Sequence, residues 1–184
     1  MKPKEKTTAV NNGSFKKQEN EETTITAVTV QGKLYIENIE TTKIKIDGTK
    51  ATEKIIKLHS NSNHIKQSNH ILLHGTTIAG FNILNIPKLH RETQKPVITV
   101  LRKKPDKQKI EKAIKNTKNH GKKLETIKQN PKYRKHPNKN IYYTNTGIPK
   151  KEAEIKLERL IHKGNYPEPL RIARLITKAI TKNN

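Results

Sequence analysis

The chain has 184 residues, a formal net charge of +23 and no cysteine. Its length fits one domain with a real core, and the lack of cysteine excludes disulfides, thiolate metal sites and cysteine nucleophiles. The 39 Lys and Arg residues indicate a nucleic-acid partner. Only six of them are Arg, however, and a surplus of Lys, Asn and Ile is also what an AT-rich genome encodes. No signal-peptide run or membrane-length apolar stretch is present, so we expect a cytoplasmic protein that does not enter membranes.

The first part of the chain predicts three strands joined by turns. β-Branched residues dominate these segments, and their turn signals include Asn11-Asn12-Gly13 and Gly32. We expect a loop over residues 16–22 and a bulge near Glu40. Together the segments predict an antiparallel meander, with strands at residues 7–10, 23–31 and 34–47.

The apolar spacing then changes to a helical period. Helices are predicted at residues 49–59, 86–93, 106–117, 121–129, 149–162 and 168–182. Thr49 is the expected N-cap of the first of these helices. The last is expected to bury one apolar stripe, made of Leu170, Ile172, Leu175, Ile176, Ala179 and Ile180. Buried strands are predicted at residues 70–74 and 96–101, a further strand is possible at 141–144, and loops are predicted at 61–69 and 130–140.

This order of elements predicts an α/β fold with a mixed sheet and a covering layer of helices. Right-handed crossovers place the strands at 70–74 and 96–101 parallel to the first strand. Such an order is that of the ribonuclease H-like fold, and other α/β folds share the same coarse pattern. We expect a single domain over residues 1–184, with a core at about 5–117 and a C-terminal helical part at about 120–184. Ligands of open α/β sheets bind beyond the carboxyl ends of parallel strands. We therefore expect a site where Asn11, Asn12 and His74 end two neighbouring strands.

Five segments, taken in order along the chain, also resemble the motifs of a known protein family. They are NNGSF at 11–15, IDGTKATE at 46–53, HGTTIAGFNILN at 74–85, PVITVLRKKPD at 96–106 and PEPLRIARLI at 167–176. Together they resemble the archaeal endonuclease dU family, a relative of endonuclease V in the ribonuclease H-like superfamily. The resemblance implies an endonuclease that cleaves DNA containing deaminated bases such as deoxyuridine, with Mg²⁺ or Mn²⁺ as cofactor.

The same resemblance implies where the carboxylates of such a site lie, and this chain departs from it there. Asn11 and Asn12 stand where the family has an aspartate pair, His74 stands at a strand aspartate, and Asn85 stands at another acid. Asp47 alone keeps a carboxylate and is a weak candidate metal ligand. Metal-dependent phosphodiester hydrolysis needs converging carboxylates to hold the ion. We therefore expect an impaired enzyme, with a non-catalytic nucleic-acid-binding protein on the same fold as the alternative.

Several of these residues also have a purely structural interpretation. Asn11-Asn12-Gly13 is ordinary turn chemistry, and Asp47-Gly48 is compatible with the start of a turn. Gly75 and Gly80, the possible second-shell residues beside Asn85, are expected to supply positive φ or a close approach of the backbone, whether or not anything binds there. A zinc or copper site at His74 is disfavoured, because His70 lies about 13 Å away along the same strand.

Basic residues near the expected site are the candidate phosphate contacts. Arg102, Lys103 and Lys104 follow the strand at 96–101 and would lie beside the cleft. Arg171 and Arg174, one turn apart on the last helix, either contact phosphate or pair with Glu168. The loop at 132–139 offers charge and the Tyr133 ring to a single strand, or is simply a solvated loop. The expected partner is DNA, with RNA as the alternative.

Overall fold

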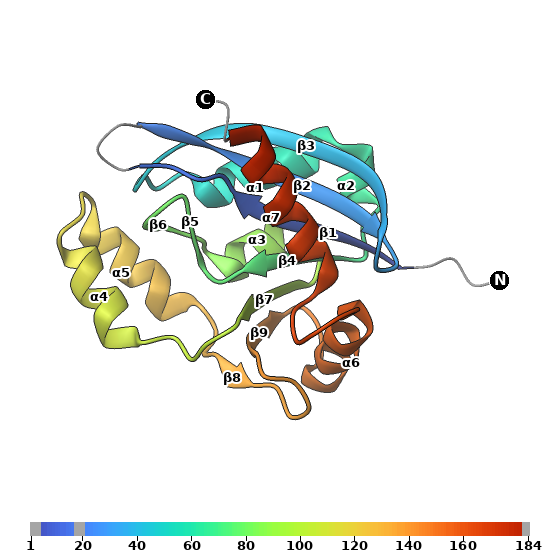
Figure 1. Cartoon of the computed structure of the whole chain (residues 1–184). Helices are drawn as coiled ribbons and strands as arrows, with labels where there is room; N and C mark the ends of the chain where they lie inside the picture. Colours follow the sequence, from blue (N-terminus) through green and yellow to red (C-terminus); the bar gives the residue numbers. More distant parts are fainter. Residues whose placement is uncertain (1–4, 17–20, 182–184) are drawn as a thin grey trace.

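The computed structural model describes residues 5–16 and 21–181. Its strands are β1 (Lys6–Asn12), β2 (Glu22–Gln31), β3 (Tyr35–Lys45), β4 (His70–His74), β5 (Thr77–Ile78), β6 (Asn82–Ile83), β7 (Val97–Leu101), β8 (Arg134–Lys135) and β9 (Tyr142–Thr146). Its helices are α1 (Ala51–Asn61), α2 (Asn63–Lys66), α3 (Ile86–Thr93), α4 (Lys107–Lys115), α5 (His120–Gln129), α6 (Lys150–Leu160) and α7 (Glu168–Thr181). Seven strands form one sheet in the order β3-β2-β1-β4-β7-β9-β8, with helices on both faces (Figure 1).

The predicted antiparallel meander is present, but its strands are longer than expected. Asn11 and Asn12 do not form a turn, because they continue β1 and pair with Thr26 and Ile25 of β2. The irregularity in the β2–β3 pair leaves Glu37 as the extra residue, not Glu40. Of the predicted loop at 16–22, residues 17–20 lie outside the described part of the chain. The consequence for the site is that Asn11 and Asn12 are held in register by strand pairing.

The parallel core of the sheet is as predicted. β1 runs parallel to β4, and β4 runs parallel to β7. The C-terminal segment then contributes β9, antiparallel to β7, and β8 forms inside the stretch at 130–140 that was expected to be a loop. The carboxyl ends of β1, β4 and β7 therefore meet at one edge of the sheet, where ligand sites of such sheets form.

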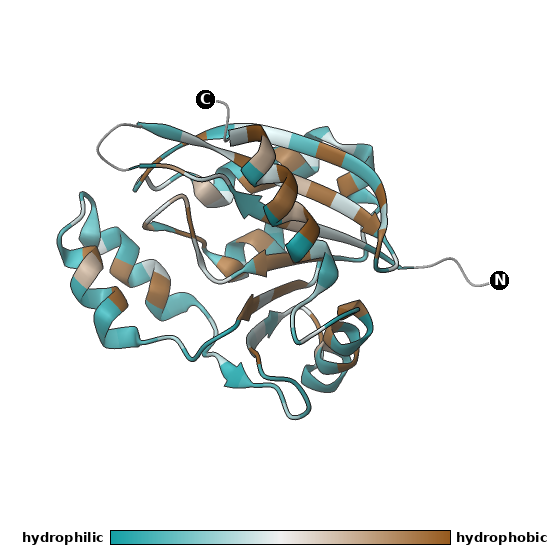
Figure 2. Ribbon diagram, in the orientation of Figure 1, coloured by the Kyte–Doolittle hydropathy of each residue, from teal (hydrophilic) through white to brown (hydrophobic). Residues whose placement is uncertain are grey.

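Two apolar cores lie on the two faces of the sheet. One packs α6 and α7 on residues such as Ala9 and Leu72, and the other packs α1, α2 and α3 on residues such as Val10 and Leu73. The brown segments of Figure 2 follow β7 and one side of α7, between which the first core lies. Alternation along each strand thus assigns every residue near the strand ends to one face or the other.

Three details of the helices differ from the sequence predictions. α1 begins at Ala51 with Lys50 as its N-cap and without a side-chain cap bond, so Thr49 is not the cap. The short helix α2 forms in the predicted loop at 61–69, where the Ser62 hydroxyl accepts a hydrogen bond from the Ile65 N–H. On α7 the predicted stripe is too wide: Leu175 lies about 200° around the helix from buried Ala173, and it is exposed. Ile180, in the last turn, is exposed as well. Within the described residues no helix is long and apolar enough to cross a membrane.

His70, at the start of β4, gives a pH-dependent stability that can be measured. Its ring is fully buried, with Nε2 3.1 Å from the Thr7 hydroxyl, and burial together with the Lys156 charge lowers its pKa to about 4. In the unfolded chain the His70 ring is protonated below about pH 6.5, whereas in the folded chain it stays neutral down to about pH 4. The free energy of unfolding therefore falls as the pH drops from 6.5 to 4. We expect the free energy of unfolding to decrease by about 3 kcal/mol over this window.

Urea unfolding at several pH values measures this loss, and the His70→Gln variant is its control. Glutamine cannot be protonated, so the variant should show a pH dependence smaller by about the same 3 kcal/mol. His59 and His74, whose pKa values are also lowered, remain in both proteins and cancel in the comparison. Equal slopes for the two proteins would show that His70 is not the group that titrates.

Candidate nucleic-acid site at the strand ends

The sheet brings two of the predicted site residues together and turns the third away. Val10 of β1 is level with Leu73 of β4, so Asn11 and His74 follow side by side at the ends of the two strands. Strand alternation puts both on the face covered by α7. Asn12 points to the opposite face, that of α1 and α3. The predicted site is therefore divided by the sheet itself.

Asn12 and Asp47 share a structural task, holding the short loop between β5 and β6. The Asn12 Oδ1 accepts a hydrogen bond from the Ala79 N–H at 3.1 Å, and the Asp47 N–H donates to the Ala79 carbonyl at 3.0 Å. The Asp47 Oδ1 accepts from the Phe81 N–H at 2.7 Å. Each of the two side chains thus has one oxygen engaged by a backbone N–H of the loop. The motif segments at 46–53 and 74–85 are thus in direct contact.

Glycine is required in that loop by backbone geometry. Gly80 has φ +79°, as expected from the sequence, and a Cβ placed on it would lie 2.1 Å from the Asp47 Oδ1. Gly75, directly after β4, also has positive φ (+75°), and its N–H donates to the Val100 carbonyl at 3.1 Å. Both glycines let the chain turn sharply at the strand ends.

Asn85, a predicted second-shell position, is the N-cap of α3. Its Oδ1 accepts from the Lys88 N–H at 2.9 Å, which satisfies one of the free donors of the first turn. Its Nδ2 donates to Gln129 of α5 at 2.8 Å. Asn85 therefore ties α5 to the body of the molecule, and neither of its polar atoms faces His74.

His74 is held by a residue that the sequence pattern did not single out. Its Nδ1 is hydrogen-bonded to the hydroxyl of Tyr166, in the loop before α7, and the two rings meet edge to face with centroids 5.8 Å apart. The Arg102 guanidinium lies over the Tyr166 ring, 4.3 Å from its centroid. Ninety-two residues separate His74 from Tyr166, so no local spacing could have revealed the pair.

The electrostatic potential around His74 is positive. Partial burial and the charges of Arg102 and Arg174 lower the pKa of His74, which keeps its ring neutral at physiological pH. Burial raises the pKa of the Tyr166 hydroxyl, so that group stays protonated. Arg171, by contrast, is engaged by the buried Glu168 of its own helix. Of the two arginines predicted on α7, only Arg174 acts electrostatically on His74 at the end of β4.

The residues present do not fit a divalent metal ion. Among the residues that the structure describes, no three His, Asp or Glu side chains gather closely enough to hold one. Asn11 and His74 are neutral, and two arginines raise the local potential that a cation would meet. Magnesium prefers charged carboxylate oxygens, which this set does not offer around His74.

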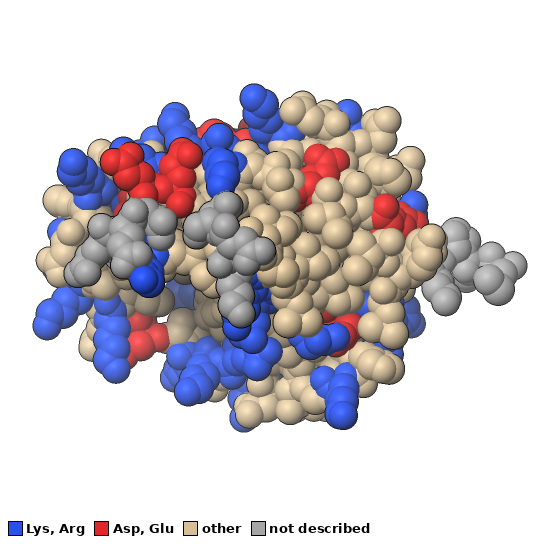
Figure 3. Space-filling model, turned by 45° about the horizontal axis from the view of Figure 1, so that its top comes forward, with Lys and Arg blue, Asp and Glu red and all other residues tan. Residues whose placement is uncertain are grey.

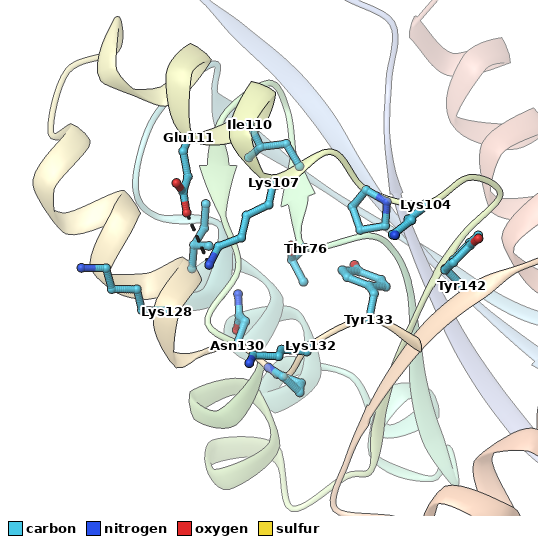
Figure 4. Close-up of a pocket in the computed structure, with 13 residues that line it drawn as sticks. Thr76, Lys104, Lys107, Ile110, Glu111, Lys128, Asn130, Lys132, Tyr133 and Tyr142 are labelled. Atoms are coloured by element: carbon cyan, nitrogen blue, oxygen red, sulfur yellow. Dashed lines mark ion pairs between the residues drawn. The ribbon is translucent and has the colours of Figure 1, made fainter. Parts of the chain in front are cut away.

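A pocket of about 300 Å³ lies next to the strand ends, beginning at Thr76 (Figure 4). The Tyr133 ring lines it, and the Tyr133 hydroxyl accepts a hydrogen bond from Thr99 at 3.0 Å. Burial raises the pKa of Tyr133 to about 12, so its hydroxyl remains neutral. The rest of the lining combines apolar and basic side chains with one acid, Glu111, which is paired with Lys107 at 3.7 Å. These residues come from the segment before α4, from α4 and α5, from the segment before β8 and from β9.

Basic side chains are concentrated on the side of the molecule that carries this pocket. In Figure 3 blue side chains are most frequent in the left half of the face, on the side that carries α4 and α5, where a few red ones lie among them, and the middle of the right half is mostly uncharged. Arg102, Lys103 and Lys104 are all exposed just past the end of β7. This arrangement lets a polyanion reach the strand ends and the pocket together.

Comparison with known sequences identifies relatives over nearly the whole chain. The sequence profile of the Endonuclease dU family matches residues 4–181. A UPF0215 protein of Archaeoglobus fulgidus is 36% identical over 146 residues, which cover 79% of this chain and 80% of that protein. A UPF0215 protein of Thermococcus sibiricus is 35% identical over 185 residues, covering 98% and 94% of the two chains.

Solved structures show the same fold. A protein of unknown function from Archaeoglobus fulgidus superposes with a TM-score of 0.88 at 31% identity, covering 96% of this chain and 98% of that one. Endonuclease V of Ciona intestinalis, in complex with a 24mer DNA containing an inosine followed by a ribo-adenosine, gives 0.62 at 15% identity, with coverage of 97% and 87%. Endonuclease V of Bacillus subtilis gives 0.64 at 12% identity, with coverage of 100% and 88%. The ribonuclease H-like fold predicted from the order of elements is confirmed.

Proposed function

This chain belongs to the Endonuclease dU family, and from that premise we propose that it binds DNA containing deaminated bases while cleaving it very poorly. The observation that carries the proposal is the composition of the strand-end site. Asn11 and His74 stand there beside Arg102 and Arg174, so the site attracts phosphate and offers a metal ion no charged ligand. Metal-dependent cleavage is impaired, and the affinity for DNA remains.

The loss of cleavage follows from the ligands that a metal-dependent nuclease needs. Two or more carboxylates hold the ion, lower the pKa of the attacking water and stabilise the leaving oxygen. On the resemblance described above, the acid positions correspond to Asn11, Asn12 and His74. Asp47 keeps its carboxylate, but its Oδ1 accepts the Phe81 N–H. Loss of one well-placed electrostatic group commonly lowers the rate by about 10²–10³.

The affinity for DNA is supported by charge and by the pocket beside the strand ends. Arg102, Lys103, Lys104 and Arg174 supply four cationic side chains for the phosphates of one strand. A volume of about 300 Å³ is within the range of small-ligand sites. Its aromatic wall, Tyr133, suits the face of a base extruded from the helix, such as uracil.

The test uses the purified chain in excess over a labelled oligonucleotide with one deoxyuridine, in Mg²⁺ or Mn²⁺. We expect binding but no nicking above the background with metal alone. Four phosphate contacts predict that log K falls with log salt at a slope of about −3 on single-stranded DNA. The matched control is the same oligonucleotide with thymidine in place of deoxyuridine, which should bind more weakly.

Impaired cleavage, DNA binding and the preference for deaminated bases can each be overturned by a separate result. Rapid, metal-dependent nicking at the deoxyuridine would overturn the impairment and leave the family's activity intact. A slope near zero would overturn DNA binding. Equal affinity for the deoxyuridine and thymidine strands would overturn the preference for deaminated bases alone.

A further inference from the structure

The contacts of His74 fix the orientation of its ring and the position of its proton. Its ring is fixed from one side by Tyr166, whose hydroxyl meets Nδ1, and Tyr166 is in turn covered by Arg102. A buried hydroxyl that stays protonated has a proton to give, and we assign it as the donor to Nδ1. The ring proton of neutral His74 then lies on Nε2. His74 therefore presents a donor, where a metal site would need an acceptor.

The two arginines beside it are available to a ligand. Among the described residues no carboxylate pairs with Arg102 or Arg174, although Arg171, one turn from Arg174, is paired with Glu168. Both arginines are exposed and both act electrostatically on His74 and Tyr166. Stacking on Tyr166 restricts the Arg102 guanidinium, which reduces the entropy it loses on binding.

We propose that His74, Arg102 and Arg174 form a direct phosphate site, in which two guanidinium groups and an imidazole N–H take the place of a metal ion. The ligand is a phosphate group with free oxygens, either in a phosphodiester backbone or as a free anion. Tyr166 is the positioning residue, because it touches His74 and Arg102 and fixes both. That the ligand is DNA rests on the proposed function. The existence of a phosphate site does not.

The chemistry favours phosphate over other anions. Guanidinium groups form bidentate, charge-assisted hydrogen bonds with phosphate oxygens, and a neutral imidazole adds one further donor without added charge. The three side chains come from β4, the segment just after β7 and α7, and both arginines act on the His74 ring, so their donors can reach one phosphate group from different sides.

The first experiment measures binding of single-stranded DNA in EDTA over a range of salt concentrations. Arg102→Gln and Arg174→Gln should each weaken binding about tenfold and make the salt slope shallower by about 0.7. Arg91→Gln on α3 removes the same charge elsewhere and should leave the slope nearly unchanged. Equal effects of all three variants would mean that only net charge matters and would overturn the site.

The second experiment separates a direct phosphate site from a weakened metal site. His74→Asp should bind DNA more than tenfold less well in EDTA, because its carboxylate repels phosphate, and Mn²⁺ should restore part of the affinity. His74→Asn, neutral and of similar size to Asp, should lose only a few-fold. If His74→Asp binds as well as the wild-type chain in EDTA, no phosphate oxygen lies against this side chain.

The third experiment uses inorganic phosphate and tells the two sources apart. The imidazole ¹⁵N signals of His74 should shift as phosphate is added, and the Arg102→Gln, Arg174→Gln double variant should abolish the shift. A phosphate-dependent shift without DNA binding would confirm the site and overturn the proposed function. DNA binding with no contribution from the two arginines and no shift would leave the proposed function standing and overturn this inference.

Discussion

Restoring three aspartates together, as Asn11→Asp, Asn12→Asp and His74→Asp, should raise the rate of metal-dependent nicking at deoxyuridine by at least about 10³-fold. The structure gives the reason, since Asn11 and His74 are neighbours on one face of the sheet. An aspartate at position 12 can still accept the Ala79 N–H with a carboxylate oxygen, so the loop is preserved. Arg102 and Arg174 would keep the new carboxylate at position 74 ionised. The measurement is single-turnover cleavage of a labelled oligonucleotide in Mn²⁺.

The control for this gain is the triple variant with alanine at the same three positions. It removes the same side chains without adding charge, so it should stay as slow as the wild-type chain. EDTA should abolish the activity of the aspartate variant. A folded aspartate variant that binds Mn²⁺ and still fails to cleave would contradict the view that charge at these positions is what limits the rate.

Gly80→Ala should lower the free energy of unfolding by about 3–5 kcal/mol. A side chain at φ +79° costs about 1–2 kcal/mol in backbone strain. The new Cβ would also lie 2.1 Å from the Asp47 Oδ1 and force it away from the Phe81 N–H, which loses a charge-assisted hydrogen bond of about 1.5–3 kcal/mol. Urea unfolding monitored by circular dichroism measures the change.

Gly164→Ala separates the two parts of that cost. Gly164 has almost the same φ, +76°, but nothing lies within 4 Å of where its Cβ would be. It should lose only the strain part, about 1–2 kcal/mol. If the two variants are equally destabilised, the Asp47–Phe81 contact contributes nothing to stability.

Local sequence signals predicted an element well where residues that begin or end a helix or strand stand at its ends. α3 matches its predicted range, residues 86–93, because Asn85 caps it and Pro87 follows in the first turn. The same reasoning failed at Asn11-Asn12-Gly13, where a turn sequence lies inside a strand. Pairing with Thr26 and Ile25 along β2 outweighs the local turn preference there.

The candidate site was predictable only in part, for a similar reason. Strand order and period placed Asn11 and His74 together, since parallel strands bring their carboxyl ends to one edge. The role of Asp47 and the second contact of Asn85 were not predictable, because they depend on Phe81 and Gln129, which later segments of the chain bring near. A residue type at a motif position does not reveal which atom its oxygen faces.

The sequence by itself determined the fold class, the meeting of two strand ends and the absence of carboxylates there, because these follow from hydrophobic period, right-handed crossovers and residue identity. Only the tertiary structure decided what surrounds His74. Tyr166 and Arg174 reach it because α7 packs back across β1 and β2, and Arg102 reaches it from the end of β7 (Figure 1). Such contacts arise from packing between distant segments, which no local pattern encodes. That packing brings Tyr166 and the charges of Arg102 and Arg174 to His74.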